Sequence, residues 1–119
     1  MINTFKLIRI GLICACLSSL LFALVPAVNA RDDGEKLVEQ ARCYMCHQLQ
    51  ETLLGPPYVA IAVRHAAHKD VMVEVLAHKI VHGGGGNWGL VPMVPNQWVS
   101  LEEARVMAAW ILKQEDKQK

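Results

Sequence analysis

The five residues Cys43-Tyr44-Met45-Cys46-His47 decide how this chain folds and what it binds. Two cysteines three positions apart lie on one turn of backbone, so their sulfur atoms can bond to the two vinyl groups of one porphyrin. The histidine that follows can reach a metal at the porphyrin centre from the same side. This C-x-x-C-H spacing is the signature for attaching a c-type haem. We therefore expect one haem c, bonded to Cys43 and Cys46 and ligated by His47.

Three other interpretations of the motif fit the sequence less well. A structural zinc site needs two further ligands at a matching spacing, and His65 and His68 do not resemble that second half. A thioredoxin-like cysteine pair needs a βαβ setting, and no strand pattern precedes Cys43. A structural disulfide would leave His47 without a role. Haem attachment therefore explains the motif better than any of these three interpretations.

The second axial ligand of a haem iron is commonly a methionine or a histidine. Met93 stands in Val91-Pro92-Met93-Val94-Pro95. The fixed φ angles of the two prolines stiffen such a loop, so that the methionine side chain points in one direction. Met72 and Met107 fall on the apolar faces of expected helices, where packing is the usual role of methionine. The other candidate ligands are typical of solvent-facing histidines; they are His65, His68, His78 and His82. We expect Met93 to be the ligand.

The apolar periodicity predicts an all-α fold with about four short helices. The expected helices cover residues 33–42, 57–67 and 70–81, and a last one begins at Ser100. Asp33 and Asp70 are candidate N-caps, and Ser100 with Glu103 matches a capping box. Residues 83–99 show no periodicity and form a long connection that carries Met93. The last helix should cross the first through Leu37, Ala41, Met107, Trp110 and Ile111.

Residues 1–30 have the pattern of an export signal. Lys6 and Arg9 precede an almost wholly apolar run over residues 10–25, and small residues end at Ala30. We expect cleavage after Ala30, leaving one domain over residues 31–119; the alternative is a membrane anchor formed by residues 10–28. The remaining chain has 11 acidic and 10 basic residues, a formal net charge of −1, so its charge does not indicate nucleic-acid binding.

Residues 32–113 resemble the short bacterial monohaem class I cytochromes c of the periplasm, which carry electrons to nitrite reductases and terminal oxidases. Besides the C-x-x-C-H motif, the resemblance rests on Leu54-Gly55-Pro56-Pro57-Tyr58, on Trp88-Gly89-Leu90-Val91-Pro92-Met93-Val94-Pro95-Asn96 and on Ala109-Trp110. It implies a class I cytochrome c fold, in which short helices and a long methionine-bearing loop surround one covalent haem. The chain departs from the family pattern in the plain glycines of residues 83–86 and at Gln97-Trp98.

The resemblance also implies a role for individual residues. Cys43 and Cys46 would form the thioethers, with His47 as the proximal ligand and Met93 as the distal one. The Pro56 carbonyl would accept a hydrogen bond from the His47 ring. Three further residues would lie near the haem propionates: Trp88 as a hydrogen-bond donor, Asn96 close to the methionine sulfur as well, and Lys79 where many relatives place an arginine. A lysine there offers a point charge rather than a planar fork.

With both axial positions filled, the iron has no place for a substrate, so we expect a one-electron carrier and not an enzyme. Electrons would pass at an exposed haem edge, to redox proteins that dock on an apolar patch of Leu53, Leu54, Leu90, Val91, Pro92 and Pro95. We expect a periplasmic monomer. Two alternatives stay open: a cytochrome subunit of an oxidoreductase complex, and a haem enzyme or gas sensor in which Met93 is labile.

Overall fold

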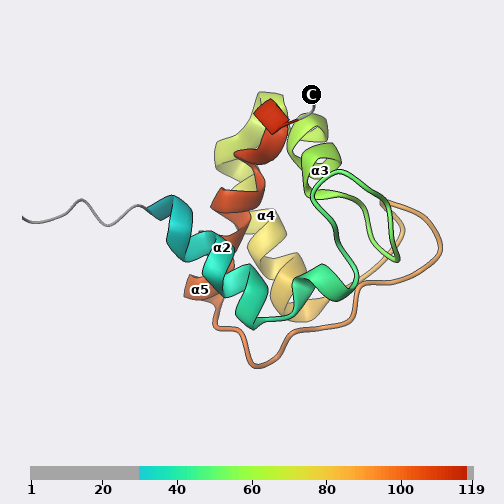
Figure 1. The fold of residues 1–119 in the computed structure, drawn as a ribbon. Helices are drawn as coiled ribbons and strands as arrows, with labels where there is room; N and C mark the ends of the chain where they lie inside the picture. Colours follow the sequence, from blue (N-terminus) through green and yellow to red (C-terminus); the bar gives the residue numbers. More distant parts are fainter. Residues whose placement is uncertain (1–29, 118–119) are drawn as a thin grey trace, which may run out of the picture.

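Helices provide the regular structure of residues 30–117, the part of the chain that the computed structural model describes. The α-helices are α2 (Ala30–Gln40), α3 (Tyr58–Arg64), α4 (Lys69–His82) and α5 (Leu101–Ile111), and short 3₁₀ turns are η2 (Cys43–Met45), η3 (Ala66–His68) and η4 (Gln114–Lys117) (Figure 1). Within these residues the β-type pairing is limited to two isolated bridges, His47 with Thr52 and Gly84 with Met93. The prediction of an all-α fold is confirmed.

The predicted export signal lies outside the described residues, apart from Ala30 at the start of α2. The predicted cleavage after Ala30 therefore stays a prediction. Over residues 30–117, no helix is long and apolar enough to cross a membrane.

Two of the predicted helix caps are wrong. Helix α2 already begins at Ala30, so Asp33 lies within the helix instead of capping it. Helix α4 begins at Lys69 with His68 in the cap position, which places Asp70 in the first turn. A carboxylate there still favours the helix, because it faces the positive end of the helix dipole.

The bounds of the first two helices also differ from the prediction, for local backbone reasons. Helix α2 ends at Gln40, and Arg42 adopts a left-handed conformation with φ 57°, which no α-helix can continue through. Pro57 has an extended ψ of 149° and precedes α3 as its cap instead of opening it. Helix α3 ends at Arg64, before the separate 3₁₀ turn η3.

The start of α5 matches the prediction in detail. The Ser100 hydroxyl accepts a hydrogen bond from the Glu103 backbone N–H at 3.2 Å, and the Glu103 carboxylate accepts one from the Ser100 backbone N–H at 2.9 Å. This reciprocal pair is the predicted capping box, which satisfies two N–H groups that a helix start otherwise leaves unpaired.

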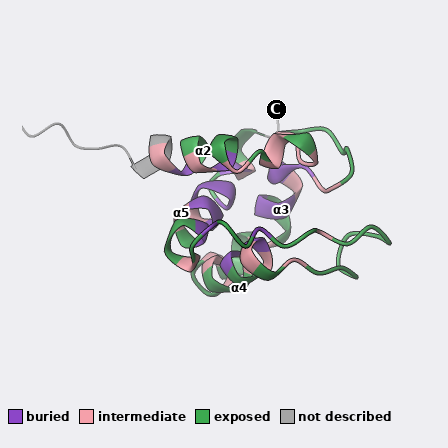
Figure 2. Ribbon diagram, turned by 90° about the horizontal axis from the view of Figure 1, so that it is seen from below, coloured by how far each residue is buried: buried purple, intermediate pink, exposed green. Residues whose placement is uncertain are grey.

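Helix α5 forms the centre of the core, because it packs against both α2 and α4 (Figure 1). Figure 2 shows the buried faces of α3, α4 and α5 turned toward one another. The predicted crossing of the first and last helices is confirmed. Of the residues predicted for it, Met107, Trp110 and Ile111 belong to the buried core, and Leu37 and Ala41 pack against that core. The two helices approach so closely that a Cβ on Gly34 would lie 2.3 Å from the Trp110 Cβ.

Two long connections complete the molecule, residues 46–57 and residues 83–99. Parts of both extend beyond α3 and α4 at the right of Figure 1. They carry most of the large apolar side chains that the described residues leave exposed, among them Leu53, Leu54, Leu90, Val91, Val94 and Trp98. The connections thus leave more of their large apolar side chains exposed than the helices do.

Candidate functional site

The two motif cysteines lie on the tight turn η2, directly after α2. The left-handed Arg42 reverses the backbone, and the N–H groups of Cys46 and His47 then both bond to the Cys43 carbonyl, at 3.1 and 2.9 Å. Both cysteines carry free thiols and are partly buried. Burial raises the pKa of the Cys43 thiol above its ordinary value, and the nearby Cys46 adds to the rise. The turn therefore presents two thiols and the following histidine in one compact unit.

The His47 ring is held in one orientation by its neighbours. Its Nδ1 lies 2.7 Å from the Pro56 carbonyl oxygen, which can only accept, so Nδ1 must carry the proton. This is the hydrogen bond that the resemblance implies. In the neutral imidazole, the other nitrogen, Nε2, is then the one without a proton, and this tautomer can bind a metal through Nε2. The arrangement is the usual outer support of a metal-bound histidine.

Gly55 and Tyr58 enclose the same ring. A Cβ on Gly55 would lie 2.4 Å from the His47 Cε1, so this position has no space for a side chain. The Tyr58 ring stacks on the His47 ring with centroids 5.7 Å apart, and its other contacts are edge-on with Tyr44 and Trp110. The Tyr58 hydroxyl is buried without a hydrogen-bond partner among the described residues, and burial raises its pKa, so it stays protonated. Tyr58 thus connects the site to the helical core.

Backbone contacts fix the loop that carries Met93. The N–H groups of Gly84 and Met93 each bond to the other residue's carbonyl, at 2.9 Å in both directions. Gly83 has φ 70°, and a Cβ there would lie 2.4 Å from the Met93 carbonyl oxygen, so glycine is required at this crossing. The Asn96 side chain donates to the Ile80 carbonyl at 2.9 Å and ties the end of the loop to α4. Of the plain glycines, Gly83 and Gly84 thus anchor the loop instead of loosening it.

A cavity of about 840 Å³ lies between these elements, within the usual size range of small-molecule sites. Cys43, Cys46, His47 and Met93 all line it, and most of its other lining residues are apolar. The side chains on its wall that carry a full charge are Arg42, Arg64 and Lys79, and no carboxylate of the described residues lines it. Such a cavity suits a large apolar molecule with acidic groups at its edge. Haem has this chemistry, so the residues present fit it.

The remaining residues implied by the resemblance lie at the same cavity. Pro56, Lys79, Trp88 and Asn96 all line it. Trp88 is 43 % exposed at the rim, whereas Asn96 is buried and uses its amide N–H groups on backbone carbonyls. Of the apolar patch proposed from sequence, Leu54, Val91 and Pro92 line the cavity, and Leu53, Leu90 and Pro95 are exposed outside its lining.

Three residues at the cavity were not anticipated in these positions. Met72 lines the cavity instead of joining the core cluster. His65 was expected to face solvent but is partly buried on the wall, and burial lowers its pKa, with the charges of Arg64 and His68 adding to the effect. Arg64 extends over the Trp88 ring. No local motif marks these positions, because each depends on how α3 and α4 meet the long loop.

Comparisons with known proteins agree with this arrangement. A family profile described as cytochrome c matches residues 32–115. Cytochrome c-552 of Hydrogenobacter thermophilus is 43% identical over 93 residues, which cover 78% of this chain and 93% of that protein. Cytochrome c-551 of Azotobacter vinelandii is 38% identical over 81 residues, covering 68% and 96%. The crystal structure of Nitrosomonas europaea cytochrome c552 superposes with a TM-score of 0.63 at 38% identity, covering 66% of this chain and 96% of that one.

Proposed function

The chain belongs to the cytochrome c family and is an electron carrier with one covalent haem c, and we propose that Cys43, Cys46, His47 and Met93 hold that haem. The observation that carries this assignment is the commitment of His47 Nδ1 to Pro56, which leaves Nε2 for the iron, on a cavity that Met93 also lines. Cys43 and Cys46 would bond to the two vinyl groups from the adjoining turn. Trp88, Asn96 and Lys79 would lie toward the propionates.

The ligand set determines which chemistry remains. When bound, haem supplies one-electron ferric/ferrous cycling at its iron. A histidine and a methionine on the two axial positions leave no vacant site for a substrate, so we expect no catalytic activity. A methionine ligand also raises the reduction potential. His47 is fixed by Pro56, Gly55 and Tyr58, and the Met93 backbone is fixed by Gly84, so little movement should accompany electron transfer.

The visible spectrum of the oxidised and reduced protein, recorded with and without carbon monoxide, tests this assignment. We expect sharp reduced bands that carbon monoxide does not change, and a weak far-red ferric band from the sulfur ligand. Replacing Met93 by alanine should remove the far-red band and allow stoichiometric carbon monoxide binding. Carbon monoxide binding by the wild-type protein would instead favour the gas sensor or enzyme, and absence of haem would contradict the whole assignment.

A carrier needs redox partner proteins, and the apolar patch is the proposed docking surface. Its leucines are well exposed, Leu53 at 52% and Leu54 at 63%, and Leu90 is fully exposed. Redox encounters use small, brief interfaces, which such a patch suits. Because the net charge of residues 31–119 is near zero, partner reduction should depend weakly on salt. A steep fall in rate with ionic strength would contradict apolar docking, and stable co-purification with a dehydrogenase would indicate the complex subunit.

The proposed location of the protein is the periplasm, after cleavage following Ala30. The supporting pattern is the basic start and apolar run of residues 1–30, since c-type haem is attached outside the cytoplasm. The mass of the protein purified from the periplasm would show whether its first residue is Arg31. An intact N-terminus in the membrane fraction would instead support an anchor formed by residues 10–28.

A further inference from the structure

Arg64 links the end of α3 to the rim of the cavity. Its guanidinium carbon lies 4.8 Å from the centroid of the Trp88 ring, within the range of a cation–π contact. The same group donates to the Asn87 carbonyl at 3.3 Å. Both partners belong to the long loop of residues 83–99, and Arg64 and Trp88 line the cavity together. Arg64 therefore holds Trp88 in place.

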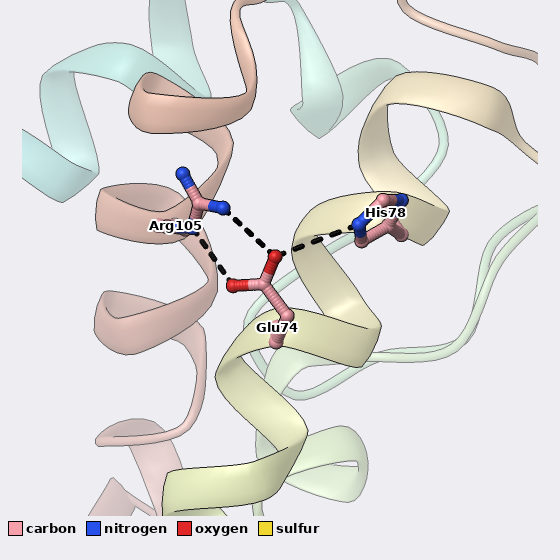
Figure 3. Close-up of polar contacts among 3 residues, drawn as sticks. All are labelled: Glu74, His78 and Arg105. Atoms are coloured by element: carbon pink, nitrogen blue, oxygen red, sulfur yellow. Dashed lines mark hydrogen bonds and ion pairs between the residues drawn. The ribbon is translucent and has the colours of Figure 1, made fainter.

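The charge of Arg64 is not neutralised by any carboxylate of residues 33–117, the side chains that the structure describes. Arg105 provides the contrast: it forms a bidentate pair with Glu74, with both N···O distances 2.8 Å, and His78 lies 3.5 Å from the same carboxylate (Figure 3). A guanidinium that lies over an aromatic ring uses its face there and keeps N–H donors along its edge. Arg64 thus combines an unpaired charge with available donors beside an apolar cavity.

We propose that Arg64, held over Trp88, is a second cationic donor for the carboxylate groups of the haem, besides Lys79. The inference rests on the proposed haem site. Lys79 offers a single point of charge, and Arg64 adds from α3 the planar fork that matches a carboxylate. The cavity wall supports this assignment, because cations line it and no described carboxylate does. Arg64 would thus bind the haem carboxylates directly and also contact Trp88.

The reduction potential of the haem protein tests the proposal. A positive charge near the iron favours the ferrous form, so Arg64→Gln should lower the potential. We expect the equilibrium constant for reduction to fall about threefold, which is about 30 mV at 59 mV per tenfold change for one electron. Lys113→Gln is the matched control, because Lys113 is also exposed and unpaired in the described part of the chain but lies off the cavity. Its charge is screened by solvent and should change the potential less.

A second measurement uses the wild-type ferrous protein with ¹⁵N-labelled arginine. The Arg64 Nε–H signal, identified by its loss in Arg64→Lys, should exchange slowly with water and show contacts to protons of both Trp88 and the haem side chains. This measurement shows whether Arg64 contacts the haem even if the Arg64→Gln protein does not accumulate.

The outcomes are distinguishable. Equal shifts in potential for Arg64→Gln and Lys113→Gln, or an Arg64 signal with no haem contact, would overturn the role of Arg64 and leave the haem site intact. A wild-type protein without haem would overturn the proposed site itself, before any variant is made.

Discussion

The helical core and the two long connections are held in their conformations by different interactions. In the core, Val38, Ala104, Met107 and Ala108 are at most 1% exposed, because the helices bury one another's side chains. In the connections, Leu54 is 63% exposed and Trp98 is 72% exposed, and both line the cavity, although both segments have hydrogen-bonded backbones. Their order comes from single backbone contacts such as Gly84 with Met93. The difference indicates that the connections need the haem to cover their apolar side chains, whereas the helices cover theirs with one another but form only a thin core.

The variant with the largest expected effect removes both points of haem attachment. Cys43→Ala combined with Cys46→Ala should leave little folded protein, because a domain of this size has a thin core and loses the apolar contacts that haem provides. Far-ultraviolet circular dichroism during heating measures the outcome. A cooperative melt of the haem-free double variant would show that the helical core is sufficient alone.

The next test is confined to the core. Gly34→Ala should destabilise the haem protein by about 2 kcal/mol, because overpacking against Trp110 costs about 3 and the helix propensity of alanine returns about 1. Denaturant unfolding measures the loss, and the visible spectrum should stay unchanged. The exposed neighbour Glu35→Ala is the control, with a change within about 0.5 kcal/mol. A shifted spectrum in Gly34→Ala would mean that the two regions are not independent.

The matching test in the connections is Gly55→Ala. Its Cβ would displace the His47 ring, which can turn partly away, so we expect a loss of about 1–2 kcal/mol. Unlike the core variant, it should change the haem spectrum, because His47 loses its orientation toward the iron. Glu51 is exposed in the same connection, and Glu51→Ala is the control that should change neither the stability nor the haem spectrum. An unaltered spectrum in Gly55→Ala would contradict the assignment of His47 as ligand.

The smallest effect concerns the start of α5. Hydrogen bonds from the Ser100 side chain and backbone lower the pKa of Glu103 below its ordinary value of 4.5. The folded pKa lies below the unfolded one, so this carboxylate stabilises the fold above about pH 4.5 and the contribution is lost as pH falls through the folded pKa. Glu103→Gln should be slightly less stable than wild type at pH 7, and this difference should shrink as the pH is lowered below 4.5, with the same spectrum. A stability difference that does not shrink as the pH is lowered would show that the carboxylate charge is not its cause.

The sequence predicts the parts of this molecule that local patterns determine. The motif from Cys43 to His47 and the capping box of Ser100 are contiguous or nearly so; the structure places the motif on one tight turn and forms the capping box. The cap predictions at Asp33 and Asp70 failed because residues upstream continue the helix. Contacts between distant segments leave no local pattern. The close approach of Gly34 to Trp110, of Gly55 to His47, and of Arg64 to Trp88 therefore emerged only from the structure.

The packing of α2 against α5 has a consequence for how the protein is made. It joins the two ends of the described chain, so the core cannot close until the last helix has been synthesised. Cys43, in contrast, emerges early, directly after α2. Once the core has closed, burial raises the pKa of the Cys43 thiol and lowers its reactivity. We therefore expect the thioether bonds to form during biogenesis on an open chain, before α5 docks.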